Sequence, residues 1–515
     1  MTATTAQSAT VHAKSRGSRV LRNYKVLFLI PSFVVADERY RRKGAKVPHA
    51  GIAYLAAALK AEGVPFAILD MNLGYSDSNA LEYIGTYQPD MICMTMYSYG
   101  HSKVNGLVDR VRTHYDGTIV VGGPHVSIAG GKVLEESSAD FAVEGEGEYT
   151  LLELVQSLCG TKEREEIPGL IWRRGNQVVV NERRPPIEDL DALPFPAYEH
   201  FELEKYLCSV DRRLPLLTSR GCPYRCSFCC TRLSMGNRFR KRSAEDVIGE
   251  IQYWYEKGWS VFDVNDDIFS LDRDRAMKIC TLIVERRLDI RFNFYVGLRV
   301  DTVDEELLAA FKAAGCTFIS YGCESGNDRV LKAIRKGITV EDVTNAVRIT
   351  KKVGINHKVN FIIGHPTETY NDAMDTIRLA RHLKCSFVRV YNLLPYPGTE
   401  AFEWIAASSS ARFLYPPAAY LNGQSRDRLD ILFETDEFTA EERRKVLLSG
   451  FRLGERTLAQ FRFGKLKGYV VYLLNRNRHA SRMGQKLLDT LLRTGVGSTL
   501  YDALVKNPWN PPKTR

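Results

Sequence analysis

The deciding stretch of this chain is Thr218-Ser219-Arg220-Gly221-Cys222-Pro223-Tyr224-Arg225-Cys226-Ser227-Phe228-Cys229-Cys230. Cys222, Cys226 and Cys229 fall within eight residues of it. Thiolates this close together on a tight loop can converge on one metal centre, and their spacing suits a cubic iron-sulfur cluster. Because only three ligands are supplied, one iron would remain open. An iron with an open coordination site can bind a reactant, which indicates a catalytic rather than a structural centre.

Two simpler interpretations compete with the cluster. A structural zinc site normally uses two ligand pairs a dozen or more residues apart, and the sequence has no second pair. Cys230 is adjacent to Cys229, so the two side chains should diverge from one metal. A disulfide stays open, but no secretory signal precedes the cysteines, which points to a reducing, cytoplasmic compartment. The remaining cysteines are expected to be small buried hydrophobes: Cys93, Cys159, Cys208, Cys280, Cys316, Cys323 and Cys385.

Composition indicates a soluble enzyme of several domains. The chain has 515 residues, of which 44% are hydrophobic and 26% charged, enough for two or three cores. No apolar run reaches the roughly 18 residues that a transmembrane helix needs.

The net charge of +10 is concentrated at the C-terminal end. Residues 462–515 contain eleven Lys or Arg and two Asp, within a predicted basic, mainly helical region at 401–515. Such a segment could attract an anionic substrate, an acidic partner or an anionic membrane surface, or could simply be a solvated helical face. Nucleic-acid binding is not expected, because no recognised nucleic-acid-binding motif accompanies the basic residues.

The N-terminal part of the chain predicts a doubly wound parallel sheet. Residues 1–24 carry no helix or strand period and are expected to be a disordered tail. In the predicted domain at 25–160, five short apolar strands alternate with helices: 25–30, 66–70, 90–96, 118–123 and 140–147. Ligands of such sheets bind at the carboxyl ends of the strands. No Gly-x-Gly-x-x-Gly follows the first strand, so a nicotinamide cofactor is poorly supported.

A connector is predicted at 161–205, with a hairpin turning at Gly175-Asn176 and several prolines beyond it. A second α/β domain follows at 206–400. Its six predicted strands are 214–219, 261–266, 291–299, 318–324, 356–364 and 387–395. Six successive units indicate an open, partial TIM-type barrel with its chemistry at the carboxyl ends of the strands. Of the polar residues there, Asp266 could equally cap a helix, whereas Glu324 is the better candidate for binding an amine or a ribose hydroxyl.

These residues carry a resemblance to a known family. The Cys222-x-x-x-Cys226-x-Phe228-Cys229 loop after the first strand of a six-unit barrel resembles the radical S-adenosylmethionine superfamily. The resemblance implies a four-iron four-sulfur cluster on the three cysteines, with S-adenosylmethionine on the open iron and a 5′-deoxyadenosyl radical as the product of its cleavage. It also implies a reductant such as flavodoxin or ferredoxin. The residues that it places against S-adenosylmethionine are Phe228, Asp266, Glu324, Gly364 and Pro366.

The preceding α/β domain is similar to that of the cobalamin-binding class of the superfamily, and the resemblance covers residues 25 to about 400. It implies cobalamin contacts in the strand-end loops: Ser32, Pro48, Gly51, Gly122, Gly123, His125, Gly145 and Glu146. The sequence lacks the Asp-x-His-x-x-Gly motif of cobalamin-dependent mutases. None of its histidines is therefore assigned as a cobalt ligand.

The resemblance implies a C-methyltransferase acting on a small-molecule natural-product or lipid precursor. One S-adenosylmethionine would methylate cobalamin, a second would generate the radical, and the substrate radical would take the methyl group from methylcobalamin. Ring contraction, cyclisation or oxidation without methyl transfer is the alternative within this class. An iron-sulfur sensor or scaffold is the alternative outside it. A methylthiotransferase is disfavoured because the N-terminal domain lacks an additional cysteine cluster. The catalytic residues and the substrate cannot be assigned from the sequence.

Overall fold

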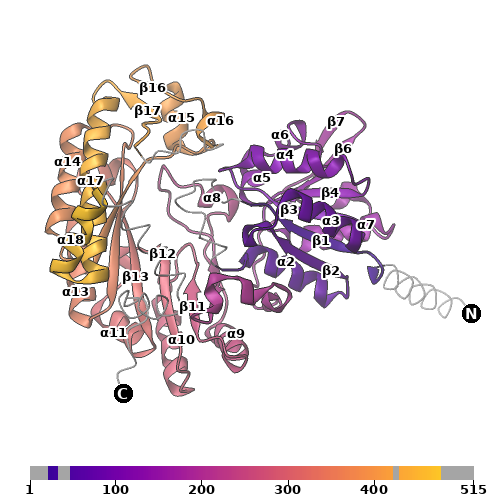
Figure 1. The fold of residues 1–515 in the computed structure, drawn as a ribbon, viewed down its shortest axis with the longest axis horizontal. Coiled ribbons are helices and arrows are strands. Elements are labelled where there is room, and N and C mark those ends of the chain that lie inside the picture. Colours follow the sequence, from indigo (N-terminus) through magenta and orange to yellow (C-terminus); the bar gives the residue numbers. More distant parts are fainter. Residues whose placement is uncertain (1–20, 33–46, 422–428, 477–515) are drawn as a thin grey trace, which may run out of the picture.

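The computed structural model describes residues 21–32, 47–421 and 429–476 and contains two large sheets side by side (Figure 1). The expected tail at 1–24 lies almost entirely outside the described residues, as does most of the basic segment at 462–515. The N-terminal sheet is purple in Figure 1, and the second sheet, with its helices, is pink to orange.

The N-terminal sheet is doubly wound, as predicted. Its strands are ordered β2-β1-β3-β4-β5-β6-β7, and β1 to β5 run parallel. Strands β1 and β3 are buried throughout, which explains their continuous apolar sequences. The strands are β1 (Val26–Ile30), β2 (Phe66–Asp70), β3 (Met91–Thr95), β4 (Thr118–Gly122), β5 (Phe141–Val143), β6 (Leu170–Arg174) and β7 (Gln177–Val180). The helices are α2 (Ala50–Ala61), α3 (Asp77–Tyr87), α4 (His101–Arg112), α5 (Pro124–Ala129), α6 (Lys132–Glu135) and α7 (Gly147–Leu158).

The predicted hairpin forms β6 and β7, but it belongs to this sheet. Strand β6 pairs antiparallel with β5, placing Ile171 opposite Ala142. Strand β5 would otherwise be an exposed edge, and pairing with β6 satisfies its backbone groups while burying Leu170, Ile171 and Trp172. The sheet therefore continues beyond residue 160. The domain limits themselves stay a prediction.

The second sheet is an open, six-stranded parallel barrel, again as predicted. Its strand order is β15-β14-β13-β12-β11-β8, and all neighbours are parallel. The strands are β8 (Arg213–Leu216), β11 (Val261–Val264), β12 (Arg291–Leu298), β13 (Cys316–Glu324), β14 (Asn356–Ile363) and β15 (Phe387–Asn392). The helices are α8 (Thr231–Ser234), α9 (Ala244–Glu256), α10 (Arg273–Glu285), α11 (Glu305–Ala313), α12 (Asp328–Ala333), α13 (Val340–Val353) and α14 (Tyr370–His382).

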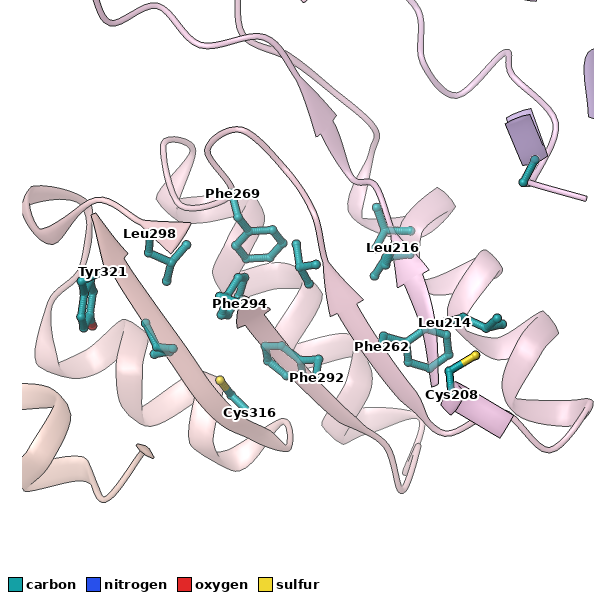
Figure 2. Packing of buried hydrophobic residues seen from close by; sticks show 14 of the residues in the cluster. Cys208, Leu214, Leu216, Phe262, Phe269, Phe292, Phe294, Leu298, Cys316 and Tyr321 are labelled. Atoms are coloured by element: carbon teal, nitrogen blue, oxygen red, sulfur yellow. The ribbon is translucent and has the colours of Figure 1, made fainter. Parts of the chain in front are cut away.

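Figure 2 shows how buried side chains of the barrel strands pack together. Phe262 of β11 lies among these residues with Phe292 and Phe294 of β12, whose rings make an edge-to-face contact at 5.6 Å between centroids. Because side chains alternate along a strand, burial of these rings fixes the register. The carboxyl ends of the strands consequently meet at one edge.

The C-terminal part packs against the last strands of the barrel. It comprises α15 (Glu400–Ala407), β16 (Ala411–Phe413), α16 (Pro417–Leu421), β17 (Phe433–Thr435), α17 (Ala440–Phe463) and α18 (Lys465–Arg476). Helix α17 begins at a capping box, in which Thr439 and Glu442 each bond the other's backbone. Among the helices that the structure describes, none has both the length and the apolar character required to cross a bilayer.

Candidate functional site

The cysteine loop is closed at its base by two short antiparallel strands, β9 (Ser219–Arg220) and β10 (Arg240–Lys241). Gly221 opens the loop with φ of 81°, and a Cβ there would lie 2.3 Å from the carbonyl oxygen of Arg238. Only glycine allows this approach. The backbone N–H of Gly221 also donates to Asp267 Oδ2 at 2.9 Å. The loop therefore leaves the barrel in a defined direction.

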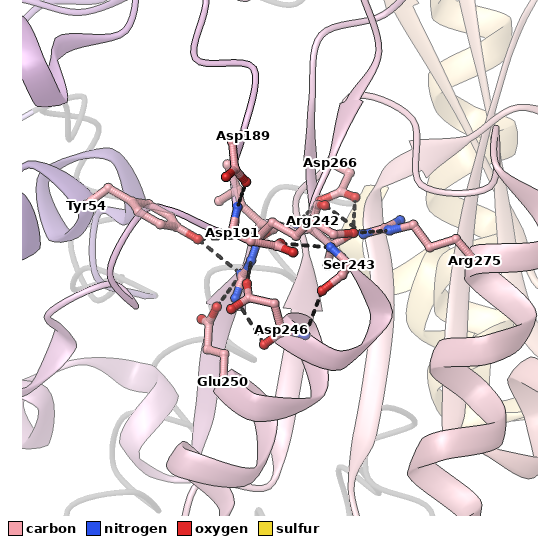
Figure 3. A network of polar contacts seen from close by, with 11 residues as sticks. Tyr54, Asp189, Asp191, Arg242, Ser243, Asp246, Glu250, Asp266 and Arg275 are labelled. Carbon is pink, nitrogen blue, oxygen red and sulfur yellow. Dashed lines mark hydrogen bonds and ion pairs between the residues drawn. The ribbon is translucent and has the colours of Figure 1, made fainter.

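Asp266 anchors the start of the loop. Its carboxylate accepts hydrogen bonds from the backbone N–H of Thr218 at 2.6 Å and from the Ser219 hydroxyl at 2.7 Å. Arg275 donates to the Thr218 carbonyl at 2.6 Å. Figure 3 shows Asp266 and Arg275 within the polar network at this place. These bonds draw the chain out of the sheet, so β8 ends at Leu216 rather than at the predicted residue 219. These bonds also occupy both carboxylate oxygens of Asp266. Asp266 was expected to contact S-adenosylmethionine.

The three thiols of the loop lie close enough to influence one another. Burial raises the pKa of Cys222 to about 11, and Cys229 and Cys226 contribute to the rise. Burial also raises the pKa of Cys226, while the cations Lys336 and Arg299 oppose the rise. Five of the scattered cysteines are buried, as expected, whereas Cys159 and Cys385 are half-buried.

Within the described ranges, no group of three or more metal-ligating side chains converges as a single ion would require. A cubic cluster is several ångströms across, so its ligands need not meet at one point. Three thiols on one loop suit it.

The loop contacts the end of β14. The Phe228 ring packs on His365 with 5.4 Å between centroids. Gly364 precedes this histidine with φ of 98°, and a Cβ there would lie 2.7 Å from Arg443 Nη1. Phe228 is thus brought together with the predicted Gly364-His365-Pro366 segment.

His365 is fully buried, and burial lowers its pKa to about 3. Neither ring nitrogen has a hydrogen-bond partner in the part of the chain that the structure describes. Buried polar atoms normally have partners, so this histidine suits a site that a polar ligand completes.

Glu324 lies at the end of β13 in the left-handed region, with φ of 67°. It accepts a hydrogen bond from Lys336 Nζ at 2.9 Å, and both side chains are buried. Lys336 was not predicted, because it follows α12 and no motif marks it. The pair places a carboxylate and an ammonium beside the cysteine loop.

The N-terminal sheet holds a cleft at the carboxyl ends of its strands, and the free space there, including the part open to solvent, is about 1090 Å³. Five of the predicted cobalamin contacts line it: Gly51, Gly122, Gly123, Gly145 and Glu146. The other lining residues are mostly apolar, such as Ile52, Val120 and Leu151. Four residues from the side of the cysteine loop complete the cleft: Leu217, Arg220, Ser234 and Met235. The cleft thus adjoins both domains.

Ser32, Pro48 and His125 are not among the residues that line this cleft. His125 bonds to the Ser98 hydroxyl at 3.1 Å and stacks on His101, and burial lowers its pKa to about 4. His49 does line the cleft. Its Nδ1 accepts from the backbone N–H of Ile52, and its Nε2 lies 2.8 Å from the Tyr97 hydroxyl. Both nitrogens of His49 are therefore engaged by the protein.

Sequence comparison identifies the class. Residues 216–380 match the family model of the radical SAM superfamily, and residues 42–155 match that of the B12 binding domain. An uncharacterized methyltransferase of Pyrococcus horikoshii is 31% identical over 83% of this chain and 91% of its own length. The chain belongs to the cobalamin-binding radical S-adenosylmethionine enzymes.

Two further similarities bear on fold and reaction. The anaerobic magnesium-protoporphyrin IX monomethyl ester cyclase of Rubrivivax gelatinosus is 25% identical over 95% of this chain and 86% of its own length. The radical S-adenosylmethionine methyltransferase TsrM of Kitasatospora setae, solved with cobalamin and a [4Fe-4S] cluster, has a TM-score of 0.65 at 20% identity. That similarity covers 77% of this chain and 80% of TsrM and concerns the fold.

The cofactors of this class are a four-iron four-sulfur cluster, S-adenosylmethionine and cobalamin, and the residues present fit all three. The cysteine loop supplies three thiols and leaves a fourth cluster corner open. The orphaned nitrogens of His365 suit a polar ligand beside Phe228. The open, mostly apolar cleft, lined by glycines, suits a macrocycle that must approach the backbone closely.

Proposed function

We propose that this protein is a C-methyltransferase acting on an unactivated carbon of a small natural-product or lipid precursor. The observation that carries the proposal is the shared cleft: Gly122 and Gly145 of the N-terminal sheet line it together with Arg220 and Met235 from the side of the cysteine loop. A methyl carrier and a radical source must act on the same substrate carbon. A cleft that adjoins both sites allows this.

We assign the cluster to Cys222, Cys226 and Cys229, and S-adenosylmethionine to the surface formed by Phe228, Glu324 and the segment 364–366. Cobalamin is assigned to the cleft. When bound, the cluster supplies the electron that cleaves the sulfonium of S-adenosylmethionine, and cobalamin supplies a carrier for the methyl group. The residues of the chain orient the ligands and exclude water: Phe228 covers His365, and the Lys336-Glu324 pair offers a fixed donor and acceptor.

The relative from Pyrococcus horikoshii supports methyl transfer, because its name describes a methyltransferase. The cyclase relative, which matches 95% of this chain, favours the second candidate: cyclisation or oxidation without methyl transfer. A reductant such as flavodoxin or ferredoxin would serve either reaction.

Product analysis separates the two candidates. The anaerobic holoenzyme is incubated with methyl-labelled S-adenosylmethionine, a chemical reductant and a fractionated metabolite extract. Methyl transfer predicts S-adenosylhomocysteine and 5′-deoxyadenosine together, with label in a new product. 5′-Deoxyadenosine without S-adenosylhomocysteine or labelled product would overturn the methyltransferase proposal and support the second candidate. Absence of 5′-deoxyadenosine with every fraction would favour a sensor or scaffold.

A further inference from the structure

One carboxylate, that of Glu146, bonds both strands at the base of the cysteine loop. Its Oε1 accepts from Arg220 Nη1 at 2.8 Å, and its Oε2 accepts from Arg240 Nη1 at 2.7 Å. Arg220 and Arg240 are directly paired across β9 and β10. The loop with the three cysteines leaves the first strand at Arg220 and returns at Arg240. Glu146 therefore holds the loop at both ends.

These charges are almost completely buried. The side chains of Arg220, Arg240 and Glu146 are 8%, 2% and 6% exposed. Glu148 adds a second carboxylate at 2.7 Å from Arg220 Nη2, and the backbone N–H of Ile187 donates to Glu146 at 2.7 Å. Removing one partner of such a network leaves a buried charge uncompensated. The network thus has one strongly preferred arrangement.

The same residues line the cleft of the N-terminal sheet. Glu146 lies between Gly145 and Gly147 in the loop after β5, and all three residues line the cleft together with Arg220. A molecule seated in the cleft therefore meets the network that fixes the cysteine loop. The sequence analysis assigned no role to Arg220 or Arg240, although Arg220 lies two residues before Cys222.

We propose that Glu146 is a positioning residue that couples the two cofactor sites, so that an occupied cleft and a loaded cysteine loop stabilise each other. The inference rests on the proposed sites for cobalamin and the cluster, but not on methyl transfer. Coupling of this kind is reciprocal: if the cluster strengthens cobalamin binding by some factor, cobalamin strengthens cluster binding by the same factor.

The test measures the ratio of two affinities. Hydroxocobalamin is titrated anaerobically into the full chain with its cluster reconstituted, and into the same chain before reconstitution. We expect binding about tenfold tighter with the cluster present, within the usual range of coupling between sites. In Glu146→Gln the ratio should fall to about twofold or less. A merely structural role would weaken both affinities alike and leave the ratio unchanged.

Matched variants locate the effect. Glu199→Gln removes an exposed ion pair with Lys60, at 2.6 Å. In this variant the ratio of the two hydroxocobalamin affinities should equal that of the unmodified chain. Glu148→Gln should reduce the ratio less than Glu146→Gln, because Glu148 pairs with Arg220 alone. If Glu146→Gln does not fold, Arg220→Lys replaces it in the comparison, since lysine keeps the charge but cannot bridge two carboxylates as a fork.

The proposal would be overturned if the cluster changed the affinity of the unmodified chain for hydroxocobalamin by less than twofold. It would also be overturned if the Glu146→Gln or Arg220→Lys variant kept the same ratio of affinities as the unmodified chain. Neither measurement uses catalysis. A chain that shows the coupling but transfers no methyl group would contradict the proposed function and leave this inference standing.

Discussion

The two parallel sheets present their carboxyl-terminal edges in different ways. At the N-terminal sheet, glycines and apolar side chains leave a preformed cleft. At the barrel, the edge is filled by polar groups that bind one another, such as Lys336 with Glu324 and Asp266 with Thr218. The first site is thus formed where small residues leave space, and the second where polar groups bind one another.

The largest expected effect concerns the cysteine loop. Replacing Cys222, Cys226 or Cys229 by alanine should reduce iron content and 5′-deoxyadenosine formation to background, because a cubic cluster held by two thiolates is not retained. Cys230→Ala, one residue beyond, is the control and should keep both. Iron, sulfide and absorbance are measured after anaerobic reconstitution. A normal iron content in any of the three variants would remove the cluster from this loop.

The next effect concerns the junction between the two sheets. Glu146→Gln should lower the free energy of unfolding by about 3 kcal/mol at pH 7, since it leaves Arg220 and Arg240 without their shared partner. Urea denaturation measures this. Glu199→Gln, which breaks an exposed pair, should cost less than about 1 kcal/mol. Equal losses in the two variants would contradict the account.

The effect of Glu146→Gln on the free energy of unfolding should depend on pH. Burial opposes ionisation of Glu146, but Arg220 and Arg240 outweigh it, so its pKa in the folded protein lies below the ordinary value. Its contribution to stability is therefore complete above the ordinary glutamate pKa of about 4.3 and is lost as the pH falls through the lower folded value. The difference between the unmodified chain and Glu146→Gln should be constant from about pH 8 to pH 5 and shrink in stronger acid. A difference that grows on acidification would refute this sign.

A smaller effect tests the glycine cleft. Gly145 has φ of 77° and no atom within 4 Å of the position of a Cβ, and it lines the cleft. Gly145→Ala should weaken cobalamin binding about tenfold, because the new methyl group occupies space that the ligand needs. Gly74→Ala carries similar backbone strain, with φ of 101°, at a position that does not line the cleft. Cobalamin titration of both variants separates strain from steric exclusion, and equal affinities would argue against the assigned site.

The smallest effect concerns the anchor of the cysteine loop. Asp266→Asn removes one of the two oxygens that bind Thr218 and Ser219, and should cost about 1 to 2 kcal/mol of stability. Asp77→Asn, which removes an exposed pair with Arg110, should change stability by less than about 0.5 kcal/mol. Thermal unfolding of the two variants provides the comparison. A neutral Asp266→Asn would show that the loop does not depend on this carboxylate.

Much of the fold could be predicted from the sequence, because period and turn residues are local signals. The strand expected at 356–364 is β14, and the hairpin turns at Gly175-Asn176 as expected. The attachment of that hairpin to β5 was not predicted, since strand pairing between distant segments leaves no local pattern. The glycines that line the cleft were placed there by the family resemblance, and their contacts with cobalamin stay a prediction.

The charged groups of the site were the harder part. Arg240 and Arg443 lie far in sequence from the groups that they contact. Lys336 lies only 12 residues from Glu324, but a lone basic residue normally indicates a solvated surface. Asp266, at the end of a predicted strand, was expected to contact S-adenosylmethionine. Its partners, Thr218 and Ser219, are visible only once β8 and β11 are paired.

The most direct measurement of the central claim is the metal content of one sample. The full chain, reconstituted anaerobically with iron, sulfide and hydroxocobalamin and freed of unbound cofactor, is analysed for cobalt and iron together. The account predicts about one cobalt and about four irons per chain, held at the same time. A chain that retains one of the two metals only by excluding the other would contradict it.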